Sequence, residues 1–347
     1  MTRQTDTPPF FIVGAGRSGT TLVRTLLAAH SRITVPPETH FLKWIDEYGA
    51  KQLEAPKDFD DFWAKLIQRI HFRDLGIDPD RVMALTEETG GRTFKGVFGA
   101  MLAAYAEDEG KPRRGEKTPG HYFYQDRIFR WWPDARIIVV RRDPRSTISS
   151  HLEAPWVSQQ LGKPNPGTPL VQRYRLYHVA HHAKLWRDAY GKHLAQTDDP
   201  RFHTLSYEDL VADPAARIAE VATFLGERFE PEMIDRRDTL RGAAADSRKP
   251  EWQSWVREHN EKSKSKISTD GLTKWRSKLS PREVAVIEAI CGRTMERFDY
   301  TPDRSAARRI YPALLGFATL RASGVERRAR GGVNRLRRSF TPDRSRA

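Results

Sequence analysis

The N-terminal part of the chain contains a short apolar run, a glycine-rich loop and a helix-forming segment in immediate succession. The apolar run, residues 10–13 (Phe-Phe-Ile-Val), stops at Gly14, as a strand buried inside a parallel sheet does. Gly14, Gly16 and Gly19 allow the backbone to turn sharply and to bring its N–H groups close to an anion. The leucines that follow Thr20 have helical spacing, so a helix N-terminus points at the same place. The segment therefore predicts a nucleotide phosphate site.

Three kinds of phosphate-binding loop fit residues 14–21. The G-x-G-x-x-G spacing is that of a dinucleotide fold, with Glu38 at a suitable distance downstream. The same residues fit the P-loop of ATPases, but Thr20 occupies the place of the lysine that holds the β- and γ-phosphates, which disfavours ATP hydrolysis and kinase activity. In the third kind, a basic residue precedes hydroxyl-bearing residues. Arg17 would then hold a 5′ anionic group, while Thr20, Thr21 and backbone amides bind the remaining oxygens.

A second strand–turn–helix signal lies in the middle of the chain. Residues 137–140 (Ile-Ile-Val-Val) predict another buried strand, and Asp143 with Pro144 forms a favourable helix start. Arg142 is therefore expected at the carboxyl end of a strand, and Ser150 about two turns into the next helix. Ligands of open α/β sheets gather at this edge, so Arg142 and Ser150 are predicted to bind an anion beside the first loop.

Two neighbouring anion sites suit a nucleotide that carries both a 5′ pyrophosphate-like group and a separate 3′-phosphate. NAD and ATP lack that 3′-phosphate. The alternative is that Arg142 forms only a surface ion pair with Asp143 or Glu116.

Five motifs in order give the chain a resemblance to a known family. They are R-S-G-T-T at 17–21, G-E-K-T-P at 115–119, R-D-P-R at 142–145 with Ser150 following, Y-E-D-L at 207–210, and a late loop with a tryptophan at 262–279. Together they resemble the sulfotransferase superfamily, which uses 3′-phosphoadenosine 5′-phosphosulfate (PAPS), and in particular its bacterial and Golgi-type branch. The resemblance covers roughly residues 9–300.

This resemblance implies a fold, a co-substrate and a donor site. The expected fold is a three-layer, P-loop-like α/β domain over residues 1–300, with a central parallel sheet flanked by helices. The tyrosine of the fourth motif, Tyr207, would lie by the adenine. The implied PAPS-binding residues are Gly16, Arg17, Ser18, Gly19, Thr20, Thr21, Arg142, Ser150, Tyr207 and Lys266. In the late loop, Lys264 and Ser268 are further candidates beside Lys266.

The resemblance also implies the catalytic residues. Family members that modify small phenols and steroids use a histidine base, but Pro119 occupies that position here. The segment Glu38-Thr39-His40-Phe41 instead resembles the E-x-H-F of heparan-sulfate sulfotransferases and the glutamate base of protein-tyrosine sulfotransferases. Glu38 is therefore the predicted general base, with His40 as a weaker candidate. Arg17 and Lys117 would stabilise the charge of the transferred group.

The predicted function is transfer of a sulfuryl group from PAPS to a hydroxyl of a saccharide, a glycolipid, a tyrosine or a small alcohol. The first alternative is a P-loop phosphotransferase or nucleotide hydrolase, which Thr20 disfavours. The second is a catalytically idle nucleotide-binding protein with a membrane-binding basic tail, which the presence of both Glu38 and Lys117 disfavours. The chain lacks metal-binding sequence motifs, so no metal is predicted.

Composition bears on the location and on the C-terminal segment. A single cysteine suits a reducing compartment, and no leader or apolar run of about 18 residues is found, so a cytoplasmic enzyme is predicted. Residues 301–347 contain twelve arginines and three acids, or +9 of the chain's formal charge of +14. They predict a basic extension with a short amphipathic helix near residues 310–320 and a disordered tail. The extension is expected either to be solvated or to lie on anionic lipid, and nucleic-acid binding is not expected.

Overall fold

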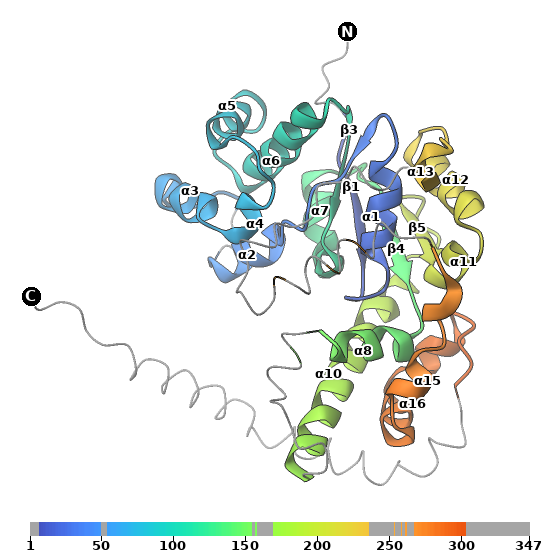
Figure 1. The fold of residues 1–347 in the computed structure, drawn as a ribbon. Coiled ribbons are helices and arrows are strands. Elements are labelled where there is room, and N and C mark those ends of the chain that lie inside the picture. Colours follow the sequence, from blue (N-terminus) through green and yellow to red (C-terminus); the bar gives the residue numbers. More distant parts are fainter. Residues whose placement is uncertain are drawn as a thin grey trace, which may run out of the picture.

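The computed structural model describes residues 7–49, 54–154, 157, 169–235, 253, 258, 261 and 267–302 of the 347-residue chain. Within them a five-stranded sheet runs in the order β2-β3-β1-β4-β5, and every pairing between neighbouring strands is parallel (Figure 1). The strands are β1 (Phe10–Gly14), β2 (Ile33–Thr34), β3 (Arg113–Lys117), β4 (Ile137–Arg141) and β5 (Phe202–Ser206). The predicted three-layer α/β fold around a central parallel sheet is confirmed.

Helices cover both faces of this sheet. They are α1 (Thr20–Ala28), α2 (Phe41–Glu47), α3 (Phe59–Ile67), α4 (Ile70–Arg73), α5 (Pro79–Thr89), α6 (Phe94–Glu109), α7 (Gln125–Trp131), α8 (Pro144–Leu152), α10 (Pro169–His193), α11 (Tyr207–Ala212), α12 (Pro214–Leu225), α13 (Glu232–Asp235), α15 (Trp275–Lys278) and α16 (Pro281–Glu296). Two 3₁₀ segments are η1 (Pro119–Tyr124) and η2 (Thr269–Gly271).

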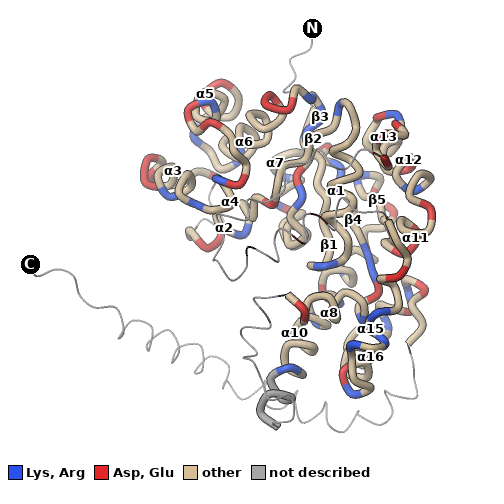
Figure 2. The backbone as a smooth tube through the Cα atoms, viewed as in Figure 1, with Lys and Arg blue, Asp and Glu red and all other residues tan. Residues whose placement is uncertain are grey.

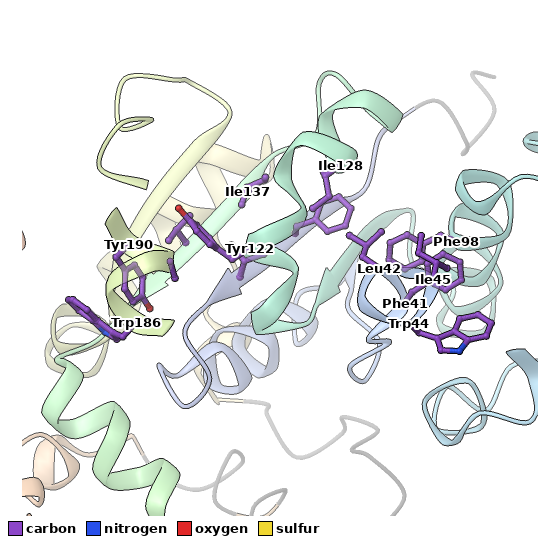
Figure 3. Close-up of a cluster of buried hydrophobic side chains, with 14 of the residues drawn as sticks. Phe41, Leu42, Trp44, Ile45, Phe98, Tyr122, Ile128, Ile137, Trp186 and Tyr190 are labelled. Atoms are coloured by element: carbon purple, nitrogen blue, oxygen red, sulfur yellow. The ribbon is translucent and has the colours of Figure 1, made fainter. Parts of the chain in front are cut away.

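The central strand divides the core into two layers because successive side chains point to opposite faces. Phe10 and Ile12 pack with residues of α1, α12 and α13. Phe11 and Val13 pack with residues of α2, α6, α7, α10 and α16. Figure 3 shows part of this second layer, with Phe41 on α2 lying against Phe98 on α6. The strand between the layers is buried on both faces, which explains its uninterrupted apolar sequence.

Local signals place the helices that border the site. The side chain of Asp143 caps α8 by accepting a hydrogen bond from the Arg145 amide, and Pro144 takes the first helical position. Both features match the sequence prediction. Ser280 and Glu283 form a capping box at the start of α16, which packs extensively on α10. The expected last core helix thus begins at Pro281 and ends at Glu296.

Strand β3 was not evident as a buried strand, because four of its five residues are charged. Its five residues are nonetheless buried, and distant backbone oxygens bind its first two side chains. Arg113 Nη1 donates to Pro8 O over 2.6 Å, and Arg114 Nη2 donates to Thr7 O over 3.0 Å. These contacts offset the cost of burying charge.

The outer helices α3, α5 and α12 carry basic and acidic residues side by side (Figure 2). In the part of the chain that the structure describes, no helix combines the length and apolar character needed to span a membrane. The predicted basic extension from residue 303 onward lies outside the described residues, as do Lys264 and Lys266.

Candidate active site

The loop between β1 and α1 is shaped by close backbone approaches. A Cβ at Gly14 would lie 2.4 Å from Val140 O, and a Cβ at Gly19 would lie 2.3 Å from the ring of Tyr207. Gly19 also has a φ of +100°, and Arg17 a φ of 72°, so the loop contains two left-handed residues. In contrast, a Cβ at Gly16 would meet no heavy atom within 4 Å. Contacts within the protein therefore require glycine at positions 14 and 19, whereas the space beside Gly16 is open.

Two aromatic residues of α10 hold this loop and the end of β4 in place. Tyr190 Oη accepts a hydrogen bond from Ala15 N over 3.0 Å and donates to Val140 O over 2.6 Å. Trp186 Nε1 donates to Arg142 O over 2.9 Å. Burial raises the pKa of Tyr190 to about 12, so its hydroxyl stays a donor. Figure 3 shows Trp186 and Tyr190 together on α10. No sequence motif marks either residue as part of the site.

The predicted second anion site is assembled beside the loop. The Arg142 guanidinium lies 4.2 Å from the ring centroid of Tyr207, and its Nη2 donates to Gly271 O over 3.1 Å. Its Nη1 lies 3.4 Å from Arg17 O, while the Arg17 side chain donates to Ser150 Oγ over 3.2 Å. The structure thus brings together four predicted donor-site residues: Arg17, Arg142, Ser150 and Tyr207.

The alternative of an Arg142 ion pair does not match this arrangement. Asp143 pairs with Arg145 over 2.7 Å, and Glu116 is fully buried with other partners. Arg142 Nε is buried and has no hydrogen-bond partner among the described residues. An arginine fork with one free buried donor is well suited to bind an anion.

Glu208 supports the residues of the predicted second anion site, a role that its place in the sequence does not indicate. Its carboxylate accepts hydrogen bonds from Asp143 N at 3.0 Å, from Tyr300 Oη at 2.8 Å and from Ser206 Oγ at 3.2 Å. It thereby ties the turn after β4 to β5 and to the end of the described domain. The adjacent η2 reaches Arg142 through Gly271, so this end of the predicted late loop lies at the site.

The predicted catalytic residues also meet. Lys117 Nζ donates to Glu38 Oε1 and lies 3.4 Å from Thr21 Oγ1 at the start of α1. On its other side, Glu38 Oε2 lies 2.9 Å from His40 Nε2. The His40 ring stacks on that of His71, with centroids 4.4 Å apart. Glu38 follows β2 rather than α1 directly, and about a third of its side chain is exposed.

Charge at this cluster favours an ionised carboxylate. Burial alone would raise the pKa of Glu38, but the Lys117 ammonium and the His40 hydrogen bond outweigh it, and the pKa lies well below its usual range. Burial lowers the pKa of Lys117, and Glu38 opposes this effect. Burial and the nearby Arg142 likewise lower the pKa of Arg17. The Glu38 carboxylate thus lies beside the cationic side chain of Lys117 and within the electrostatic influence of Arg17.

Within the described ranges, no group of three or more His, Cys, Asp or Glu side chains is arranged to hold a metal ion.

Comparison with known proteins identifies the class of protein. Residues 8–231 match the model of the sulfotransferase family, and this is well over half of the chain, so the protein belongs to that family. Family membership favours the third of the three loop types and identifies residues 8–231 as a sulfotransferase-family domain. The predicted membership of the sulfotransferase superfamily is confirmed.

Individual relatives are more distant. A segment of 146 residues is 30% identical to the nodulation protein NoeE of Sinorhizobium fredii, and it spans 42% of this chain but only 31% of that relative. The sulfotransferase domain from the curacin biosynthetic pathway has a TM-score of 0.54 at 22% identity, covering 83% of this chain and 98% of its own. The sulfotransferase domain of the Synechococcus PCC 7002 olefin synthase has a TM-score of 0.50 at 22% identity, covering 82% and 94%. At these identities, the two structures show the shared fold alone.

Proposed function

We propose that the enzyme transfers the sulfuryl group of PAPS to an acceptor hydroxyl, with Glu38 as general base. The acceptor oxygen bonds to sulfur, the bond from sulfur to the 5′-phosphate oxygen breaks, and adenosine 3′,5′-bisphosphate leaves. The hydroxyl proton passes to Glu38. Lys117 and Arg17 stabilise negative charge on the sulfuryl oxygens and the leaving phosphate.

The observation that carries this proposal is the position of Lys117. Its ammonium contacts both Glu38 and Thr21, so it joins the carboxylate to the phosphate-binding loop. A sulfuryl group held at the start of α1 would therefore lie beside the Glu38 carboxylate. An acceptor hydroxyl that attacks this group must lie at the same place, within reach of the carboxylate. This arrangement fits a transfer reaction between a loop-bound donor and a second substrate.

The residues present fit PAPS as the donor. The open space beside Gly16 and the hydroxyls of Ser18, Thr20 and Thr21 suit the 5′-phosphosulfate. Arg142 Nε is a buried donor that needs a partner. The Arg142 guanidinium lies over the ring of Tyr207 and contacts the backbone of Arg17, whose side chain bonds Ser150, and this arrangement suits a 3′-phosphate near an adenine. The ring of Tyr207 offers an aromatic surface for the adenine of the nucleotide. Lys266 remains a proposed contact from the late loop.

A weakly basic carboxylate is sufficient for this reaction. Sulfuryl transfer is expected to resemble phosphoryl transfer, with a loose transition state in which bonding to the incoming oxygen is slight. The proton of the acceptor hydroxyl then becomes strongly acidic only after the transition state, as the new oxygen–sulfur bond forms. Glu38 is ionised at neutral pH and is ready to accept that proton.

Binding and transfer experiments test the function. Adenosine 3′,5′-bisphosphate should raise the thermal unfolding temperature of the full chain, whereas ATP, NADH and NADPH should not, because a ligand stabilises the state that binds it. Labelled sulfate from PAPS is then offered to oligosaccharides, a glycolipid, a tyrosine peptide and small alcohols. Stabilisation by ATP instead of the bisphosphate contradicts the donor assignment. Bisphosphate binding without transfer to any acceptor class favours the idle nucleotide-binding protein.

The pH dependence of the reaction distinguishes the two candidate bases. Because the pKa of Glu38 lies below the ordinary value of 4.5, its base function is present above that pH and is lost only as the pH falls through the lowered pKa. We expect kcat/KM to stay level between about pH 7 and pH 5, whereas a base with the ordinary histidine pKa of about 6.5 would already lose activity there. The measurement is kcat/KM for labelled transfer across this range. A fall in kcat/KM within this range would contradict Glu38 as the base.

The basic extension gives a separate proposal: that residues 301–347 attach the enzyme to anionic lipid. A net excess of arginine beside a short apolar segment supports it. Deleting these residues should then abolish sedimentation with phosphatidylserine vesicles and leave bisphosphate affinity unchanged. If the full chain does not sediment with the vesicles at low salt, the extension is solvated. The cytoplasmic location stays a prediction.

A further inference from the structure

A buried carboxylate lies directly behind the proposed base. Glu116 is fully buried in β3, next to Lys117. Glu116 pairs with Phe11 and Lys117 with Ile12 across the β1–β3 ladder. Side chains of paired residues in a parallel sheet share a face, so Lys117 points toward α1 and Glu116 toward the layer of α2 and α6. Lys117 and Glu116 are consecutive in β3 and therefore point to opposite faces of the sheet.

Three donors satisfy this carboxylate. Thr39 Oγ1 and Thr118 Oγ1 donate to Oε1 over 2.9 and 2.6 Å, and His121 Nδ1 lies 2.8 Å from Oε2. Burial alone would raise the pKa of Glu116, but the His121 ring and the hydroxyl donors outweigh it and keep the pKa below its usual value. We call these four residues, Glu116, Thr39, Thr118 and His121, the Glu116 hub.

The hub residues hold the start of α2 with their remaining polar atoms. Thr118 Oγ1 accepts from His40 N over 3.2 Å, and Thr39 Oγ1 accepts from Phe41 N over 3.3 Å. His121 Nε2 accepts from Leu42 N over 3.3 Å. The first amides of a helix have no partners within the helix, and here side chains supply them.

These contacts act on the residues that carry the chemistry. His40 has a φ of 48°, a left-handed conformation that is unfavourable for a residue with a side chain. This turn directs the His40 ring to Glu38, with Nε2 2.9 Å from Oε2. Thr39 lies between the two. The left-handed conformation of His40 is held from both sides, because Thr118 binds the amide of His40 and Thr39 binds the amide of Phe41.

The hub requires an ionised carboxylate. Each threonine hydroxyl donates to Glu116 and accepts from an amide, and the His121 ring does the same with its two nitrogens. If Glu116 accepts all three hydrogen bonds, the two threonine oxygens and His121 Nε2 stay available to accept from the amides at the start of α2. In Glu116→Gln, the side-chain NH₂ group of the glutamine would face either the threonine hydroxyls or His121 Nδ1, and that neighbour would have to accept instead of donate. One amide of α2 would then lose its partner.

We propose that Glu116 is a positioning residue for sulfuryl transfer: through Thr39, Thr118 and His121 it fixes the turn that places His40 and Glu38 in the site. This inference rests on the proposed function, because it assigns the positioning to the proposed base. Glu116 does not touch the reacting atoms. Its effect is expected on kcat rather than on donor binding, which depends on the loop after β1 and on Arg142.

The kinetic test uses Thr118. Thr118→Val keeps the shape but removes the bonds to Glu116 and to His40 N. We expect kcat for labelled transfer to fall about 10- to 100-fold, as small misplacements of catalytic groups do. Adenosine 3′,5′-bisphosphate affinity should stay near that of the wild type, and Thr118→Ser should restore kcat. Thr86→Val is the matched control, because it removes a buried hydroxyl that bonds Val82 O within α5.

A second measurement needs no acceptor. Long-range ¹H–¹⁵N spectra of the full chain with labelled histidine report which ring nitrogen carries the proton. His121, assigned from the spectrum of His121→Gln, should be protonated at Nδ1 in the wild type and should move toward the Nε2 form in Glu116→Gln. If Glu116→Gln does not fold, the wild-type spectrum and the Thr118 variants still decide.

The outcomes separate this inference from the proposed function. Near-normal kcat in Thr118→Val combined with loss of turnover in Glu38→Gln leaves the base assigned and overturns the positioning role. Near-normal turnover in both variants overturns both. An Nε2-protonated His121 in the wild type overturns the hub, whatever Glu38 does. Loss of kcat in Thr118→Val with recovery in Thr118→Ser and an Nδ1-protonated ring supports it.

Discussion

Replacing Glu38 by glutamine is expected to lower the turnover of sulfuryl transfer by about 10²–10⁴-fold, the usual effect of removing a general base. Glutamine keeps the shape of the side chain and can still accept a hydrogen bond from Lys117 or His40. It cannot take up a proton at neutral pH. Donor affinity should barely change, because the loop, Arg142 and Ser150 provide the contacts proposed for the nucleotide. Labelled transfer and calorimetry with adenosine 3′,5′-bisphosphate, performed on the same preparation, measure the two effects separately.

Two further variants make the Glu38→Gln result specific. Glu47→Gln removes a carboxylate that is more than half exposed and pairs only with Lys43 among its described ion-pair partners, so it should leave turnover unchanged. His40→Ala should reduce turnover less than Glu38→Gln, because the ring orients the carboxylate in this scheme. If Glu38→Gln turns over almost normally, Glu38 is not the base. A larger loss in His40→Ala than in Glu38→Gln would transfer the role to His40.

Local sequence signals were sufficient to predict the elements that carry the proposed donor-binding residues. Strands β1 and β4 are apolar runs that end at Gly14 and Arg141. A glycine-rich loop follows β1, and the helix-start residues Asp143 and Pro144 follow β4. Arg142 and Ser150 could be placed at one sheet edge because that edge follows from the strand–turn–helix order alone. The structure brings these two residues together with Arg17 and Tyr207, and their binding of the nucleotide stays a prediction.

The supports of the site could not be predicted in this way, because they depend on contacts between distant segments. Tyr190 binds Ala15 across 175 positions of sequence, and its spacing from Trp186 indicates only a packed helix. Strand β3 shows no apolar pattern, since its buried charges are satisfied by other elements. The role of Glu116 depends on Thr39, 77 positions away. An apolar sequence pattern predicts that a segment is buried, but it does not identify the residues that a buried side chain contacts.

Replacing Arg142 by alanine is expected to change ligand preference rather than to weaken every ligand equally. We assign the 3′-phosphate to Arg142, and a hydrogen bond to a charged group contributes about 1.5–3 kcal/mol, or about ten- to a hundredfold in affinity. Arg142→Ala should therefore weaken adenosine 3′,5′-bisphosphate by that factor. It should weaken adenosine 5′-phosphosulfate, which has no 3′-phosphate, far less. Calorimetric titration of both ligands measures the ratio.

The ratio is the decisive quantity because Arg142 also has structural contacts. Its guanidinium holds Gly271 O and lies on the ring of Tyr207, so its loss loosens the late loop for any nucleotide. That indirect effect acts on both ligands and cancels in the ratio, whereas loss of a 3′-phosphate contact does not. Arg141→Ala is the matched control. Arg141 precedes Arg142, donates to Phe298 O and packs on Phe298 and Tyr300, so its removal should leave the ratio unchanged. Equal weakening of both ligands by Arg142→Ala would show that the 3′-phosphate is bound elsewhere.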